Sequence, residues 1–113
     1  MTEPVGYLEF LGLEQRARIV ITDSGGVQEE TTFLGVPCLT VRDNTERPVT
    51  ITAGTNRLVG RDPSRMLSAA RAVLAVPAAG KKAPPELWDG RAGERIARVI
   101  RSCTAVAVRA PAD

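Results

Sequence analysis

Residues 22–30 read Thr-Asp-Ser-Gly-Gly-Val-Gln-Glu-Glu and directly follow a β-branched apolar run, Arg-Ile-Val-Ile, at 18–21. The apolar run predicts a short buried strand, and the segment after the two glycines predicts a helix. Ser24 is suited to cap that helix, and Gly25 and Gly26 have no Cβ to keep an anion from the backbone N–H groups. The tripeptide Ser-Gly-Gly at 24–26 is, on its own, more typical of an ordinary capped turn. With a helix N-terminus behind it, however, it also suits a phosphorylated ligand.

A second polar loop follows one βα unit later and shifts the balance from an ordinary capped turn toward a site for a phosphorylated ligand. Residues 37–41 read Pro-Cys-Leu-Thr-Val and predict another short strand, and the loop at 42–48, Arg-Asp-Asn-Thr-Glu-Arg-Pro, carries two arginines. In a parallel sheet both loops leave the carboxyl ends of neighbouring strands, where open α/β folds bind ligands. One edge of the sheet would then offer a helix N-terminus and a guanidinium to the same anion.

The whole chain alternates short apolar runs with capped helical segments, which predicts an α/β fold with parallel strands. The expected elements are a helix over 7–16, a strand over 19–22, a helix over 25–34, a strand over 37–41, a short helix from 48 closed by Gly54, a strand over 57–59, a helix from Pro63 capped by Asp62, and a helix from 90 to about 106. Two helices have apolar faces expected to meet a core, through Met66, Ala70, Val73 and Leu74 in one and Ile96, Val99 and Ile100 in the other. Residues 109–113 are expected to be a frayed tail. Three strands are few for a doubly wound domain, so the chain is expected to be either part of a domain or a domain that needs a partner to cover the edge of its sheet.

Composition excludes several classes of function. The 113 residues suffice for one small domain, and 43% apolar with 25% charged residues is ordinary for a soluble globular protein. A net charge of +2 without a basic, aromatic-rich run predicts no nucleic-acid partner, and no apolar stretch predicts a membrane span or a signal segment. Cys38 and Cys103 are interpreted as buried reduced thiols, which suits a cytoplasmic location. The chain has no histidine and no cysteine cluster, so we expect neither a metal site nor a cofactor.

Several segments, in their order and spacing, resemble the C-terminal domain of non-hydrolysing bacterial UDP-N-acetylglucosamine 2-epimerases. They are residues 22–30, Gly-Val-Pro at 35–37, the loop at 42–48, Gly-Thr-Asn-Arg-Leu-Val-Gly at 54–60, and Trp-Asp-Gly-Arg-Ala-Gly-Glu-Arg-Ile at 88–96, and together they cover most of residues 6–100. The resemblance implies a GT-B architecture, in which two Rossmann-like domains hold a nucleotide sugar between them. It makes this chain a three-layer part of the second domain, with about three strands.

The resemblance also implies contacts with UDP at six positions: Ser24, Gly25 and Gly26 at the pyrophosphate, Glu30 at the ribose, Arg47 at the nucleotide and Phe10 at the base. Other interpretations stay open for some of these side chains. Phe10 also suits a core position, and Arg42 and Arg47 also suit a solvated loop in which they pair with Asp43 and Glu46. Glu29 is interpreted as an ordinary charge on an exposed helix face.

In that family the reaction eliminates UDP to give 2-acetamidoglucal and then adds it back with inverted configuration at C2. The acids and the histidine that move the proton belong largely to segments that this chain does not match, so we assign no catalytic residue. We expect residues 1–113 to be a partial UDP-binding domain of an enzyme of polysaccharide biosynthesis, inactive alone. Its ligand would be UDP or a UDP-N-acetylhexosamine, and its protein partner a missing N-terminal domain or a second copy. The alternatives are a non-catalytic nucleotide-sugar binding or interaction module, or a fragment of a hydrolysing epimerase or another GT-B enzyme.

Some positions depart from the commonest pattern of the family. Val49 stands where many members have Glu, and Gly93 stands where Ser is usual. These departures leave the expected UDP site intact and keep the identity of the sugar and the subfamily open. The loop at 45–48 and the segment at 54–60 favour epimerases over transferases.

Overall fold

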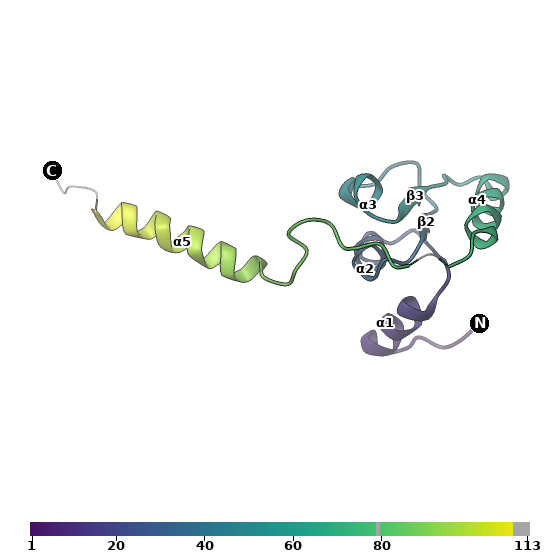
Figure 1. Cartoon of the computed structure of the whole chain (residues 1–113), viewed down its shortest axis with the longest axis horizontal. Coiled ribbons are helices and arrows are strands. Elements are labelled where there is room, and N and C mark those ends of the chain that lie inside the picture. The colour runs from purple at the N-terminus through teal and green to yellow at the C-terminus, as the bar shows by residue number, and fades with distance from the viewer. Residues whose placement is uncertain (79, 110–113) are drawn as a thin grey trace.

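The computed structural model describes residues 1–78 and 80–109 (Figure 1). Its elements are, in chain order, α1 (Tyr7–Arg16), β1 (Val20–Thr22), α2 (Gly25–Leu34), β2 (Cys38–Thr40), α3 (Val49–Thr52), β3 (Asn56–Leu58), α4 (Pro63–Ala75) and α5 (Ala92–Arg109). The predicted order of helices and strands is confirmed throughout. β1 and β2 are shorter than expected, because only three residues of each lie in parallel register with a neighbour, and β3 has the expected three residues but begins one residue earlier.

The three strands form one parallel sheet in the order β1-β2-β3. Thr22 lies opposite Thr40, and Thr40 lies opposite Leu58, so the strands end level with one another. The loops that follow them therefore leave from the same edge. This is the parallel α/β arrangement that the sequence predicts, with α4 on one side of the sheet and α2 and α3 on the other (Figure 1).

The two faces of the sheet have different chemistry. Leu39 and Val59 are buried with Ala69 of α4, and Met66 and Ala70 pack against this cluster. Under α2, by contrast, the buried side chains are mostly uncharged and polar: Gln28, Thr31, Thr32, Thr40, Thr50 and Asn56. The alternation of side chains along β2 explains the difference, since Leu39 points to the opposite face from its neighbours.

The prediction that the last helix faces a core is wrong. Ile96, Val99 and Ile100 are 58%, 62% and 59% exposed, and α5 projects from the globular part, which gives the chain extents of 68 × 30 × 28 Å (Figure 1). The apolar stripe is present as the sequence indicates, but α5 does not fold back to pack this stripe against the globular part. Cys103, on the same helix, is exposed, so the expectation of two buried thiols holds only for Cys38.

Smaller corrections concern α4 and the tail. Leu74 is 43% exposed, and Ala69 takes a core position that the predicted apolar face did not include. Residue 109 ends α5 rather than opening a frayed tail, and residues 110–113 lie outside the described residues. Within residues 1–78 and 80–109, no helix has the length and apolar character needed to cross a membrane.

Candidate functional site

The turn between β1 and α2 has the geometry that its sequence indicates. Ser24 is the N-cap of α2, and its hydroxyl accepts a long hydrogen bond of 3.5 Å from the backbone N–H of Val27. Its own N–H donates to the hydroxyl of Thr22 at 3.1 Å, which holds the end of the strand to the start of the helix. Gly25 and Gly26 form the first turn, so free backbone N–H groups and the positive end of the helix dipole lie at this point.

The loop at 42–48 folds over that helix N-terminus. A Cβ placed on Gly25 would lie 2.8 Å from Oε1 of Glu46 and 3.1 Å from the guanidinium carbon of Arg47. The structure therefore brings Ser24, Gly25 and Arg47 together, although they come from different loops. A side chain at position 25 would therefore displace the two charged groups from the helix N-terminus.

The charged groups of this loop are paired. Nε of Arg47 lies 2.9 Å from Oε1 of Glu29, an ion pair by distance, and Nη1 of Arg47 donates to Glu46 at 3.1 Å. Glu46 also pairs with Arg42 at 3.0 Å, and the hydrogen bond from Arg42 lowers the pKa of the Glu46 carboxyl. Arg42 thus pairs with Glu46 rather than with Asp43. Glu29, interpreted from the sequence as a plain surface charge, is a partner of Arg47.

A buried polar network holds the loop in place. Oε1 of Gln28 accepts hydrogen bonds from the hydroxyl of Thr45 at 2.6 Å and from Nδ2 of Asn56 at 3.1 Å. Nδ2 of Asn56 also donates to Thr50 at 3.0 Å, and the hydroxyl of Thr45 accepts from the backbone N–H of Arg47 at 3.0 Å. Sequence reasoning missed this network. The available signal was the presence of amide and hydroxyl side chains at inward-facing positions of α2 and β3.

Glu30 lies one turn into α2, half-buried, and faces α1. Tyr7 of α1 lies beside Glu30, and this carboxylate raises the pKa of the phenol. Glu14 of α1 is only 3% exposed, and burial, followed by the neighbouring Glu30, raises its pKa to about 7. Neither Tyr7 nor Glu14 was singled out from the sequence. Phe10 is 38% exposed on α1 and lies outside the buried cluster, which argues against its interpretation as a core residue.

A hollow of about 630 Å³ opens at the carboxyl edge of the sheet beside this site. Its polar lining comes from the ends of all three strands: Thr22 and Asp23 after β1, Arg42 after β2 and Arg61 after β3. Arg61 was not anticipated, because the third strand was predicted over 57–59, bounded by Gly60. Its position one residue later, at the same edge, was the signal that could have identified it.

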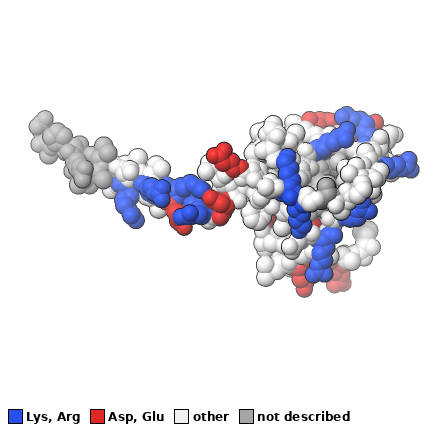
Figure 2. Space-filling view, in the orientation of Figure 1, with Lys and Arg blue, Asp and Glu red and all other residues white. Residues whose placement is uncertain are grey.

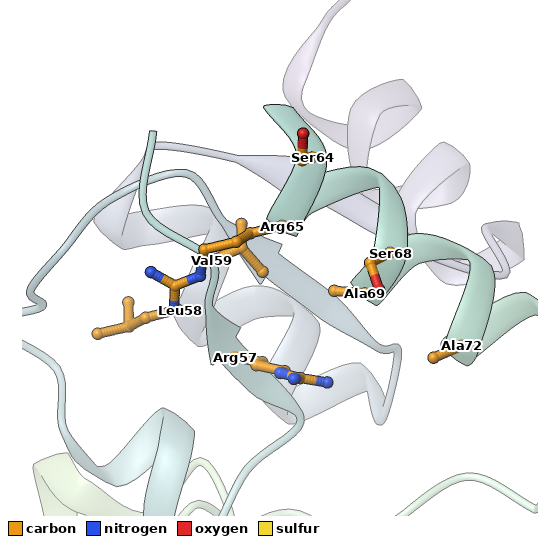
Figure 3. Close-up of a pocket in the computed structure, with 8 residues that line it drawn as sticks. All are labelled: Arg57, Leu58, Val59, Ser64, Arg65, Ser68, Ala69 and Ala72. Atoms are coloured by element: carbon orange, nitrogen blue, oxygen red, sulfur yellow. The ribbon is translucent and has the colours of Figure 1, made fainter. Parts of the chain in front are cut away.

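A smaller hollow of about 340 Å³ lies elsewhere, between β3 and α4 (Figure 3). It is lined by Arg57 and Arg65 with two serines of α4, and it contains no residue of the 22–30 or 42–48 segments. On the face shown in Figure 2, the Lys and Arg side chains of the described residues are spread over the globular part and α5 rather than gathered in one patch. The candidate site is therefore the N-terminus of α2 with the loop that covers it.

Comparison with known proteins gives a consistent result. Residues 1–101 match the family model described as UDP-N-acetylglucosamine 2-epimerase. The UDP-N-acetylglucosamine 2-epimerase of Methanocaldococcus jannaschii is 49% identical over 98 residues, which are 87% of this chain and 26% of that protein. The chain thus spans about a quarter of the length of such curated relatives.

Solved structures agree with the sequence comparison. The crystal structure of the Methanocaldococcus jannaschii enzyme in complex with UDP-GlcNAc and UDP matches with a TM-score of 0.73 and 48% identity, covering 89% of this chain and 27% of that one. The structure of Staphylococcus aureus MnaA with UDP matches with a TM-score of 0.78 and 30% identity, covering 98% and 31%. With a parallel α/β fold shared with GT-B epimerases and a family match along most of its length, this chain belongs to the UDP-N-acetylglucosamine 2-epimerase family.

Proposed function

We propose that residues 1–113 are the UDP-binding part of the C-terminal domain of a UDP-N-acetylglucosamine 2-epimerase. The observation that carries the proposal is the position of the Arg47 guanidinium against Gly25, at the N-terminus of α2. A helix N-terminus and a guanidinium at one point form a site for a doubly charged diphosphate. A relative of the same family has been solved with UDP-GlcNAc and UDP, which supports the same ligand here.

Different residues of the site bind different parts of the nucleotide. The Ser24 hydroxyl and the N–H groups of Gly25 and Gly26 hold the diphosphate, and Arg47 adds positive charge. The carboxylate of Glu30 accepts hydrogen bonds from the ribose hydroxyls, and Phe10 lies against the base. Holding the diphosphate favours elimination, because UDP leaves with the bonding electrons and its new negative charge is stabilised where it forms.

The chain supplies binding of the leaving group and no proton transfer at C2. A proton must be removed from C2 and returned, which needs positioned acids or bases. We assign none of these carboxylates to that role, since Glu29 and Glu46 pair with Arg47 and Glu30 is assigned to the ribose. Epimerisation accordingly requires the remainder of a GT-B enzyme, which closes the other half of the cleft.

The test is a titration of the isotope-labelled chain with UDP, followed by NMR. Chemical-shift changes should concentrate in residues 22–30 and 42–48, and Arg47→Ala should weaken binding by about tenfold or more, the loss expected for a charged hydrogen-bonding partner. Arg57→Ala is the matched control, because Arg57 is exposed on β3 and lines the other hollow. Shifts confined to regions outside those two segments, or equal affinities for the two variants, would contradict the assignment.

A second experiment tests the division of labour. UDP-N-acetylglucosamine incubated in D₂O with the purified chain should incorporate no deuterium at C2 above the buffer control. Incorporation would show that the chain carries its own base, and the proposal that it is only the binding part would then be abandoned.

A further inference from the structure

Glu14 is an acid in a position that does not suit a charge. It lies on the inner side of α1 and is 3% exposed, and neither oxygen of its carboxyl has a hydrogen-bond donor among the described residues. An ionised carboxylate that is buried without a donor is strongly disfavoured, so such a group retains its proton or finds an acceptor for it. The question is therefore where the proton of Glu14 points.

The acceptor is Glu30 on the neighbouring helix. α1 packs against α2, and Glu30 is the charged group beside the Glu14 carboxyl, so one proton can be shared between the two; Tyr7, at the start of α1, also lies beside Glu30. From β2, Cys38 is the titratable group that faces Glu14. Burial acts first and Glu30 second to raise the pKa of Glu14 to about 7. Two groups that can donate a hydrogen bond, the Tyr7 hydroxyl and a protonated Glu14 carboxyl, thus lie on the protein side of Glu30.

We propose that Glu14 is a positioning residue of the nucleotide site, whose carboxyl donates its proton to Glu30 and holds that carboxylate toward the ribose. The inference rests on the proposed function, because it uses the assignment of Glu30 to the ribose. When the shared proton is lost, two negative carboxylates lie side by side next to a ligand that is itself negative. Glu30 then loses its fixed orientation, and the nucleotide binds more weakly. Binding should therefore weaken as the pH rises through neutrality.

The experiment measures the affinity of the chain for UDP-N-acetylglucosamine at about pH 6 and about pH 8. This ligand is preferred to UDP because its diphosphate is esterified at both ends and does not change charge in that range. If only the protonated pair binds well, a group titrating near pH 7 gives about a tenfold weaker affinity at the higher pH. Glu14→Gln, whose amide also donates, should bind equally well at both pH values. Glu14→Met, of similar volume but without a donor, should bind weakly at both.

Three outcomes overturn the inference. The first is equal affinity of the wild-type chain at both pH values, and the second is the same pH dependence in Glu14→Gln. The third needs no ligand. Carbon-13 shifts should show the Glu14 carboxyl losing its proton near neutral pH, and an ordinary acidic titration of Glu14 would refute the shared proton while leaving the proposed UDP site intact. Absence of ligand-induced shifts in residues 22–30 at either pH would refute the UDP site, and the inference with it. Circular dichroism of each variant checks that it remains folded.

Discussion

Asn56→Ala tests how much of this fold depends on its buried polar network. Asn56 is 6% exposed, and its amide makes three hydrogen bonds, donating to Gln28 at 3.1 Å and Thr50 at 3.0 Å and accepting from Thr40 at 2.5 Å. Each is worth about 1 kcal/mol net, so the substitution should lower the free energy of unfolding by about 3 kcal/mol. That is a large share of the roughly 5–15 kcal/mol that holds a domain together.

Urea unfolding followed by the fluorescence of Trp88 measures this loss. Trp88 is the only tryptophan and lies against α1 and α2, so it reports on the globular part rather than on α5. Asn44→Ala is the matched control, because Asn44 is exposed and makes one long bond of 3.3 Å with Arg42, and it should cost no more than about 0.5 kcal/mol. Equal losses for the two variants would refute the conclusion that the network stabilises the α2 face of the sheet.

The remaining predictions concern packing and protonation. Gly54→Ala should destabilise the chain by about 1–3 kcal/mol, because its Cβ would collide with the Thr50 carbonyl, whereas Gly12→Ala, with open space around it, should stabilise α1 by about 0.5–1 kcal/mol; urea midpoints that move in the same direction would contradict both. Because folding raises the pKa of Glu14 from 4.5 to about 7, its contribution to stability is complete below about pH 4.5 and is lost as the pH rises from there through about 7. The melting temperature should therefore fall across that pH range in the wild type but not in Glu14→Gln. Parallel curves of melting temperature against pH for the two proteins would contradict this prediction. An arginine of α5 holds the pKa of Asp89 at about 2, so the stabilising effect of this contact should disappear only as the pH falls through about 2. Asp89→Asn should therefore reduce the helicity measured by circular dichroism at neutral pH, and an identical spectrum would argue against the contact.

Local chemistry was sufficient to predict most elements. The bounds of α2 agree residue for residue, because Ser24 caps one end and Gly35, at φ 71°, ends the other. Pro63 and Asp62 likewise place the start of α4. Capping depends on neighbours in the chain, so the sequence alone carries the necessary information. The burial of α5 could not be predicted in the same way, because an apolar stripe shows that a face suits burial and not what covers it.

The candidate site, like the fold, could be predicted only in part from the sequence. Two loops at the carboxyl ends of parallel strands must share an edge, so the approach of Arg47 to Gly25 follows from topology. The positions of Gln28 and Glu14 do not follow, because a polar residue at an inward-facing position contradicts the pattern used to find the core. Only the folded structure shows that Gln28 has hydrogen-bond partners across the fold and that Glu14 has a second acid beside it. Their roles depend on tertiary contacts that no local pattern encodes.

The pairing of Arg47 has a consequence for selectivity. Its guanidinium is already occupied by the carboxylates of Glu29 and Glu46, at 2.9 Å and 3.1 Å. Any anion that binds there must exchange places with tethered carboxylates, which compete at high local concentration. A free inorganic ion brings nothing else to offset that competition, whereas a nucleotide adds contacts through its ribose and base. We therefore expect the loop at 42–48 to exclude phosphate and sulfate from Arg47 at ordinary concentrations. Only a ligand long enough to reach Glu30 as well should displace the carboxylates.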